Sequence, residues 1–205
     1  MRLVIATPSP FARKARIALL EKNLPHEVVV HNPWQQTIAA NPLGKVPVLF
    51  LDDGRVVHDS SVILEYLETL DAPPRLIPAD PLQRVMHRQV EAIADGICDA
   101  VVLIVTERSR PAQKQSAEWI SRQAAKIPKA LDELEGLLRS QDSFTAHAYG
   151  LAEIATGCAL GYLDLRYPDL DWRRGRPHLA ALAGRLAERA SFAATLPKAQ
   201  PVSIS

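Results

Sequence analysis

Ser9 is the first residue whose position points to chemistry, because it stands between Pro8 and Pro10 in the stretch TPSPFARKAR, where an apolar run gives way to a helical pattern. Proline restricts its own backbone and that of the residue before it, so Ser9 is expected in a defined place. A hydroxyl at the mouth of a helix can donate a hydrogen bond to a thiolate, whereas a serine without a nearby histidine is a poor nucleophile. Ser9 alone could equally be a plain helix cap.

A second stretch, Gly44-Lys45-Val46-Pro47, precedes an apolar run typical of a strand. Proline cannot donate to a sheet ladder, so Pro47 belongs at a strand start or edge. The bond before it can be cis, and the N–H and C=O of Val46 could then pair with a peptide-like ligand as an extra strand would. The alternative from these residues alone is an ordinary trans proline at the start of a strand.

Asp59 and Ser60 form the third candidate, at the start of a helical pattern over residues 60–70. A helix N-terminus has free N–H groups and a partial positive charge, so it suits a carboxylate, and Ser60 adds a hydroxyl donor. Asp59 can bind an ammonium group. Together the two residues fit the head group of an α-amino acid, although a plain N-cap would use the same residue types.

Other reactive residue types point to no further site. The six histidines show no pair three or four residues apart, so no helical metal site is predicted. The basic residues Arg13, Lys14 and Arg16 are interpreted as a solvated helix face, with attraction of an anionic ligand as the alternative.

The period of the apolar residues indicates the elements that must position these side chains. Over the first 70 or so residues it predicts strands and helices in the order β-α-β-α-β-β-α, with a short helix possible at residues 34–40 and a hairpin at Asp53-Gly54. Strand-helix-strand connections make the first part of the sheet parallel, and the hairpin makes its end antiparallel. This is the thioredoxin-like order.

The remainder of the chain reads as helical. We predict a thioredoxin-like domain at residues 1–72, a proline-rich linker at 73–80 and an all-helical domain at 81–205. Long amphipathic helices are expected over residues 82–105 and 120–138, and Pro128 should kink or break the second. Two further helices run through Ile154, Cys158 and Tyr162, and through Leu179, Leu182 and Leu186.

Composition argues against several classes of partner. The chain of 205 residues has a net charge of +1, so bulk charge favours neither nucleic acid nor an anionic membrane as a partner. Its longest apolar run, residues 100–105, is far short of the roughly 20 residues that span a bilayer. The start of the chain lacks the apolar segment of a secretory signal, and Cys98 and Cys158 form no CxxC pair. A reducing cytosol is the expected compartment.

The three motifs stand in an order that resembles the cytosolic glutathione transferase family, and in particular small bacterial members with SPF at the first helix. The resemblance rests on SPF, NPLGKVPVL, the hairpin, HDSSVILEYL, the linker and the helical half, so it covers essentially the whole chain. It implies a transferase that binds glutathione as co-substrate, stabilises its thiolate and conjugates it to a small apolar electrophile. It also implies a homodimer, for which the apolar faces of the first two long helices are a plausible interface.

The resemblance assigns a role to each candidate residue. Ser9 matches the catalytic position that orients and activates the glutathione sulfur, with Thr7 or a backbone N–H as the alternative, and Phe11 should line the site. Val46 should bind the cysteinyl backbone, with Pro47 cis. Asp59 and Ser60 should hold the γ-glutamyl group, and Lys45 is assigned to the glycine carboxylate.

Two positions depart from the family pattern. Relatives with cysteine in place of the SPF serine catalyse thiol-disulfide exchange, which is disfavoured here because neither cysteine lies at that position. Gly150 stands where the family has a Ser or Thr helix cap, so the helix after it should start more weakly. The rival functions are a glutathione-dependent isomerase or lyase, and a non-catalytic binding or regulatory protein with the same fold.

Overall fold

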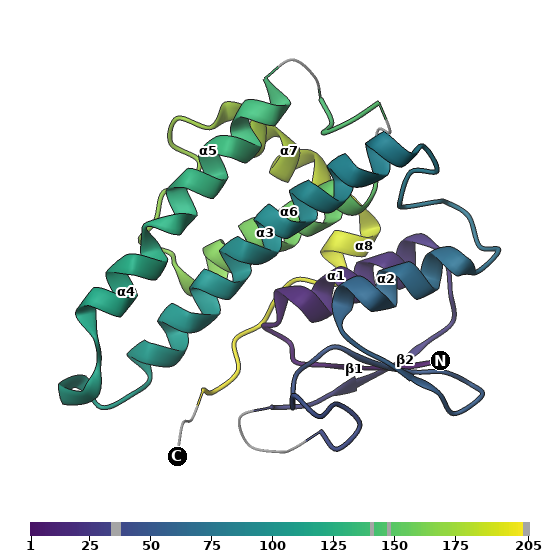
Figure 1. The fold of residues 1–205 in the computed structure, drawn as a ribbon, viewed down its shortest axis with the longest axis horizontal. Coiled ribbons are helices and arrows are strands. Elements are labelled where there is room, and N and C mark those ends of the chain that lie inside the picture. The colour runs from purple at the N-terminus through teal and green to yellow at the C-terminus, as the bar shows by residue number, and fades with distance from the viewer. Residues whose placement is uncertain (34–37, 140–141, 147–148, 203–205) are drawn as a thin grey trace.

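The computed structural model describes residues 1–33, 38–139, 142–146 and 149–202. Its first part is a four-stranded sheet with two helices on one face (Figure 1). The elements in chain order are β1 (Arg2–Ile5), α1 (Pro10–Glu21), β2 (Glu27–Val30), β3 (Val48–Phe50), β4 (Val56–Val57) and α2 (Ser60–Thr69).

The strands are arranged in the order β2-β1-β3-β4. Strand β1 pairs parallel with β2 and antiparallel with β3, and β3 and β4 form the hairpin at Gly54. The predicted parallel start and antiparallel end of the sheet are therefore confirmed. The possible short helix at residues 34–40 lies mostly outside the described residues, and residues 38–40 are not helical.

Alternation along the strands divides the apolar side chains between the two faces of the sheet. Leu3 and Ile5 belong to the main core, which α1 and α2 cover, whereas Val4 belongs to a small second cluster with Val48 and Ile38. Because strand side chains alternate in direction, a single residue of slip would exchange the two sets. The register of β1 with its neighbours is therefore fixed, and so is the end of the strand that precedes Ser9.

Helices make up the second part of the molecule. They are α3 (Pro81–Arg108), α4 (Ala117–Ala124), α5 (Lys126–Leu138), α6 (Leu151–Arg166), α7 (Pro177–Ala187) and α8 (Ala190–Ala193), with a 3-10 turn at Ala112–Lys114. Helices α3 and α6 lie side by side beyond α1 and α2 (Figure 1). No helix of the described residues is long and apolar enough to cross a membrane. The division into domains at residues 73–80 stays a prediction.

Two expectations about the long helices have different outcomes. The predicted break near Pro128 is confirmed, since α4 ends at Ala124 and α5 begins at Lys126. The apolar face of α5 was expected to be available to a second subunit, and this is wrong. Its residues Ile127, Leu131, Leu134 and Leu138 are buried in the main core of the same chain.

Candidate functional site

A pocket of about 350 Å³ lies between the first part of the chain and the helices. Four of the predicted site residues line it: Ser9, Phe11, Lys45 and Val46. Across from them, Asp99 comes from α3, and Tyr162 and Arg166 come from α6. The structure thus brings together candidates that are up to 37 residues apart in the sequence, and adds a wall that the sequence motifs did not indicate.

Ser9 is the N-cap of α1, and Pro10 occupies the first helical position. Its backbone N–H donates to the Ala6 carbonyl at 3.0 Å, and its Oγ accepts from the Ala12 N–H at 3.2 Å. The Oγ is therefore held at the positive end of the helix dipole. In the part of the chain that the structure describes, no acceptor takes the hydroxyl hydrogen, so Ser9 can cap the helix and still donate to a ligand.

Thr7 was the alternative donor. Its hydroxyl donates to the Lys198 carbonyl at 2.9 Å, and it lines a separate hollow beside Ser9 and Arg16 instead of the pocket that contains Val46. Since its hydrogen is already used, Thr7 is the weaker candidate of the two.

The Val46–Pro47 peptide bond is cis, as the family resemblance implied. Pro47 itself does not line the pocket, whereas Val46 does, and no hydrogen bond among the described residues uses the N–H or C=O of Val46. Both groups remain available to a ligand backbone.

Asn41 shapes the same loop and was missed by the sequence motifs. It is 4% exposed, accepts from the Leu43 N–H at 3.0 Å through its side-chain oxygen, and donates to the Lys45 carbonyl at 2.8 Å. Gly44, at φ +63°, completes the turn in a conformation that favours glycine. The Asn-Pro pair that opens the loop is a turn signal that could have identified Asn41.

Asp59 and Ser60 lie at the N-terminus of α2 and are not part of the pocket lining. Asp59 is the N-cap, and its Oδ1 accepts from the N–H groups of Ser61 at 3.0 Å and Val62 at 3.4 Å. The cap interpretation is thus correct for Asp59, while its second carboxylate oxygen has no partner among the described residues. The His58–Asp59 peptide bond is also cis, and Ser60 is 2% exposed.

Electrostatics link this helix N-terminus to the pocket. Burial raises the pKa of Asp99, and the charge of Asp59 raises it further, whereas Lys45 lowers it. Asp99 therefore lies within electrostatic range of two predicted site residues that come from different loops.

The interpretation of Arg13, Lys14 and Arg16 as a solvated face is wrong for the first two. Lys14 is 1% exposed, and its ammonium binds Glu91 at 2.7 Å and Asp95 at 2.6 Å on α3. Arg13 is 8% exposed and donates to the Phe192 carbonyl. The prediction failed because α1 lies between the sheet and the helices, so two of its faces are buried.

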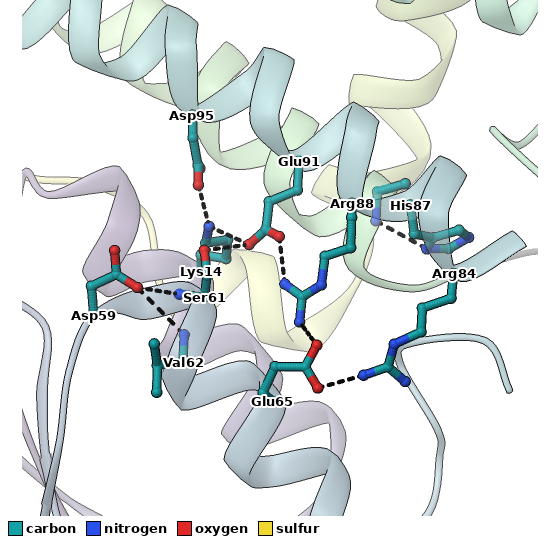
Figure 2. Close-up of polar contacts among 11 residues, drawn as sticks. Lys14, Asp59, Ser61, Val62, Glu65, Arg84, His87, Arg88, Glu91 and Asp95 are labelled. Carbon is teal, nitrogen blue, oxygen red and sulfur yellow. Dashed lines mark hydrogen bonds and ion pairs between the residues drawn. The ribbon is translucent and has the colours of Figure 1, made fainter. Parts of the chain in front are cut away.

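Glu91 connects three elements around this buried lysine (Figure 2). Besides Lys14 of α1, it accepts from the Ser61 hydroxyl of α2 at 3.1 Å and from Arg88 of its own helix at 2.5 Å. Arg88 also pairs with Glu65 of α2, as does Arg84. This cluster fixes α2, and with it Asp59, against the helices.

The two cysteines offer no reactive thiolate. Cys98 and Cys158 are buried free thiols, and burial raises the pKa of Cys98 well above its usual value and that of Cys158 to about 11. Both stay protonated at neutral pH. The described residues contain no group of three or more His, Cys, Asp or Glu side chains that could hold a metal ion.

The helix start at Gly150, which was expected to be weak, is supported by one residue of α6 itself and by one residue of α3. Glu153 accepts from the Gly150 N–H at 2.9 Å, which is half of a capping box. The missing cap side chain is replaced in part by His87 of α3, whose Nδ1 accepts from the Ala152 N–H at 3.3 Å. Helix α6 is thereby positioned by its neighbour α3.

Fold and pocket together define a thioredoxin-like domain joined to a helical domain. The loops that carry Ser9, Lys45 and Val46 face α3 and α6 across the pocket. Family models agree with this class: residues 8–70 match the glutathione S-transferase N-terminal domain and residues 117–185 match its C-terminal domain. The chain belongs to the glutathione S-transferase family.

Relatives extend over nearly the whole chain. The uncharacterized GST-like protein YibF of Escherichia coli is 42% identical over 96% of this chain and 98% of its own length. A crystal structure of a glutathione S-transferase from Methylobacterium radiotolerans, in complex with glutathione sulfonate, is 46% identical with a TM-score of 0.95, and covers 100% of this chain and 98% of that one. Another from Methylobacillus flagellatus, with glutathione bound, is 37% identical with a TM-score of 0.88, and covers 96% and 99%.

Proposed function

We propose that this protein is a glutathione transferase that binds glutathione, stabilises its thiolate and conjugates it to a small apolar electrophile. The observation that carries the proposal is the position of Ser9, whose oxygen is fixed at the N-terminus of α1 and whose hydroxyl hydrogen is unused, on the wall of a pocket shared with Val46. Glutathione bound in the related structure from Methylobacillus flagellatus supports the same ligand here.

Thiolate stabilisation follows from this position. Lowering a thiol pKa from about 8.5 to about 6.5 requires roughly 2.7 kcal/mol of preferential stabilisation of the anion. One hydrogen bond to a charged acceptor contributes about 1.5–3 kcal/mol and a helix N-terminus about 0.3–1 kcal/mol. Ser9 and the first turn of α1 can therefore supply the shift together. The thiolate would then attack the electrophile, forming a carbon–sulfur bond.

The remaining candidates hold the tripeptide. The free N–H and C=O of Val46 would pair with the cysteinyl backbone, beside cis-Pro47, and Phe11 would line the sulfur end. At the N-terminus of α2, the free oxygen of Asp59 would bind the γ-glutamyl ammonium, with the carboxylate at Ser60.

Lys45 would reach the glycine carboxylate. It lines the pocket, and its charge is close enough to lower the pKa of Asp99. A cation at this end of the pocket is consistent with a ligand that carries a carboxylate there.

Calorimetry with glutathione at millimolar concentration tests binding, and conjugation of 1-chloro-2,4-dinitrobenzene tests transfer. Binding with conjugation supports the transferase. Binding without conjugation of any electrophile would favour the isomerase, the lyase or the regulatory protein, and a substrate screen separates these. No binding at millimolar glutathione would overturn every glutathione-dependent function considered.

We also infer a homodimer, with an interface that keeps the start of the first long helix but uses α2 in place of the second long helix. Exposed apolar side chains gather on α2 and the start of α3, where Val62 is 51%, Leu82 70%, Val85 61% and Met86 38% exposed. Sedimentation of the wild type and of Val85→Glu tests this, since a charge in an apolar interface should yield monomers. The two buried free thiols agree with a reducing compartment such as the cytosol.

A further inference from the structure

Arg166 is a positively charged residue of the pocket. None of its contacts with the described residues accounts for a charge at this place. It is the last residue of α6, lines the same pocket as Ser9, and has a buried Nε without a hydrogen-bond partner. No carboxylate of the described residues pairs with it. A guanidinium held partly out of water without an anion is unfavourable, and a bound anion would relieve that cost.

The acidic residues nearest to Arg166 along the two helices already have partners. Asp164, two residues earlier, accepts from Trp172 at 2.7 Å and pairs with Arg173 at 2.8 Å. Glu107, at the end of α3, pairs with Arg110 at 3.0 Å. The positive charge of Arg166 therefore remains available to a ligand.

Tyr162 adds a second donor one turn before Arg166. It is 6% exposed and lines the same pocket as Arg166. Burial raises the pKa of Tyr162 to about 12, so the phenol is protonated at neutral pH. No hydrogen bond among the described residues uses the Tyr162 hydroxyl, so its hydrogen is available to an acceptor.

Arg166 and Asp99 lie at different levels of the pocket. Helices α3 and α6 run in the same direction, since His87 contacts Ala152 near their starts and Arg108 stacks over Tyr167 at their ends. Arg166, next to Tyr167, is therefore level with the end of α3.

Asp99 lies nearer the middle of α3, whereas Thr106 lies near its end, and both line the pocket. Their separation of seven positions corresponds to about 10 Å along the helix axis. Asp99 is within electrostatic range of Lys45 and Asp59, which are the proposed glutathione contacts. The Arg166 end is thus left for the second substrate.

Apolar side chains line the pocket as well, among them Phe11, Leu43, Val102 and Val105. We propose, on the basis of the transferase function above, that the electrophile is an apolar molecule that carries a carboxylate. Arg166 and Tyr162 bind the carboxylate, and the reacting carbon faces the thiolate at Ser9. In a substitution the carbon–sulfur bond forms, the leaving group departs with its bonding electrons, and the carboxylate is unchanged.

Two probes that share a reacting ring test this assignment: 4-chloro-3,5-dinitrobenzoate and its methyl ester. Each is compared with its own uncatalysed reaction, because the substituents alter intrinsic reactivity. Arg166→Gln should lower kcat/KM for the benzoate about 10- to 100-fold, mainly through KM, and change that for the ester less than about threefold. For the benzoate, kcat/KM of Arg166→Lys should lie between the values of the wild type and of Arg166→Gln, because lysine keeps the charge but not the planar guanidinium. Arg174→Gln removes an exposed arginine that does not line this pocket, and it should leave kcat/KM for both probes unchanged.

Calorimetric binding of the two glutathione conjugates provides a readout without turnover. The wild type should bind the carboxylated conjugate at least about tenfold more tightly than the ester conjugate, and Arg166→Gln should remove that preference. If the wild type binds glutathione and both conjugates with no preference, or if the variant loses both probes equally, the carboxylate assignment is wrong and the transferase stands. Failure to bind glutathione at all would instead reject the transferase, and the assignment with it. The preference of the wild type decides the question even if the variants do not fold.

Discussion

The ammonium of Lys14 lies 2.7 Å from the carboxylate of Glu91, and both side chains are almost completely buried. This contact joins α1, which Ser9 caps, to α3, which carries Asp99 on the opposite wall of the pocket. The relative position of the two walls therefore depends on an ion pair that is removed from water. A buried pair of this kind is costly to break, because the remaining partner loses both water and its counter-charge.

Lys14→Met should destabilise the protein by about 3–5 kcal/mol, since it leaves the buried Glu91 and the partly buried Asp95 without their shared cation. Urea unfolding followed by circular dichroism measures the change. Lys129→Met, at an exposed position of α5, is the matched control and should alter stability by less than about 0.5 kcal/mol. A similar small effect at Lys14 would show that the pair contributes little to the fold.

Asp95→Asn should alter how stability depends on pH. Burial raises the pKa of Asp95 to about 6 in the folded protein, and Lys14 offsets this only in part. Between pH values of about 4 and 6 the folded state therefore holds a proton that the unfolded state has lost, so ionisation of Asp95 weakens folding as the pH rises. The stability of the wild type relative to the variant should fall by up to about 3 kcal/mol across that window and stay constant above it. Urea unfolding of both proteins from pH 4 to 8 measures the difference, and a flat difference contradicts the shifted pKa.

The sheet and the three motifs at Ser9, Val46 and Asp59 were predictable because their signals are local. Proline restriction, a strand start and a helix cap depend on neighbouring residues, and the period of apolar residues gave the long helices and the break before Pro128. The burial of Lys14 was not predictable in this way. Its partners Glu91 and Asp95 lie 77 and 81 residues further along, and only the packing of α1 against α3 brings them together.

The wall formed by Asp99, Tyr162 and Arg166 was missed for a related reason. Along α6, residues 151–163 are almost all buried, so an apolar pattern identifies the helix but not the face that meets the pocket. Tyr162 was placed on a predicted helix as an apolar residue, and Arg166 resembles an ordinary basic residue in a last helical turn. Their proposed role depends on the other elements that surround the pocket.

Gly157→Ala should destabilise the protein although alanine favours helices. A Cβ at Gly157 would lie 2.5 Å from the Phe192 ring and 2.7 Å from Leu186, both of which are buried, so α7 and α8 would have to shift. Overpacking of this kind costs about 1–3 kcal/mol. Gly136→Ala is the control, because a Cβ there meets nothing within 4 Å, and it should stabilise α5 by about 0.5–1 kcal/mol. Thermal unfolding measures whether each substitution raises or lowers the stability. Stabilisation by both substitutions would mean that α6 and α8 are loosely packed at Gly157.

Ser9→Ala should raise the pKa of bound glutathione by about one to two units, because the thiolate loses the donor that contributes most to its stabilisation. Calorimetric affinity for glutathione at pH 5.5, where the bound thiol is protonated in both proteins, should change less than about threefold. The thiolate absorbance of the complex, titrated from pH 5 to 10, measures the pKa. Loss of the helix cap is a separate effect of about 1 kcal/mol on stability, and Ser116→Ala isolates it, since Ser116 caps α4 with the same 3.2 Å contact that Ser9 makes in α1. Ser116→Ala should lower stability similarly and leave the thiol pKa unchanged. If Ser9→Ala also leaves that pKa unchanged, a backbone N–H of the first turn of α1 becomes the better candidate, because the Thr7 hydroxyl already donates to Lys198.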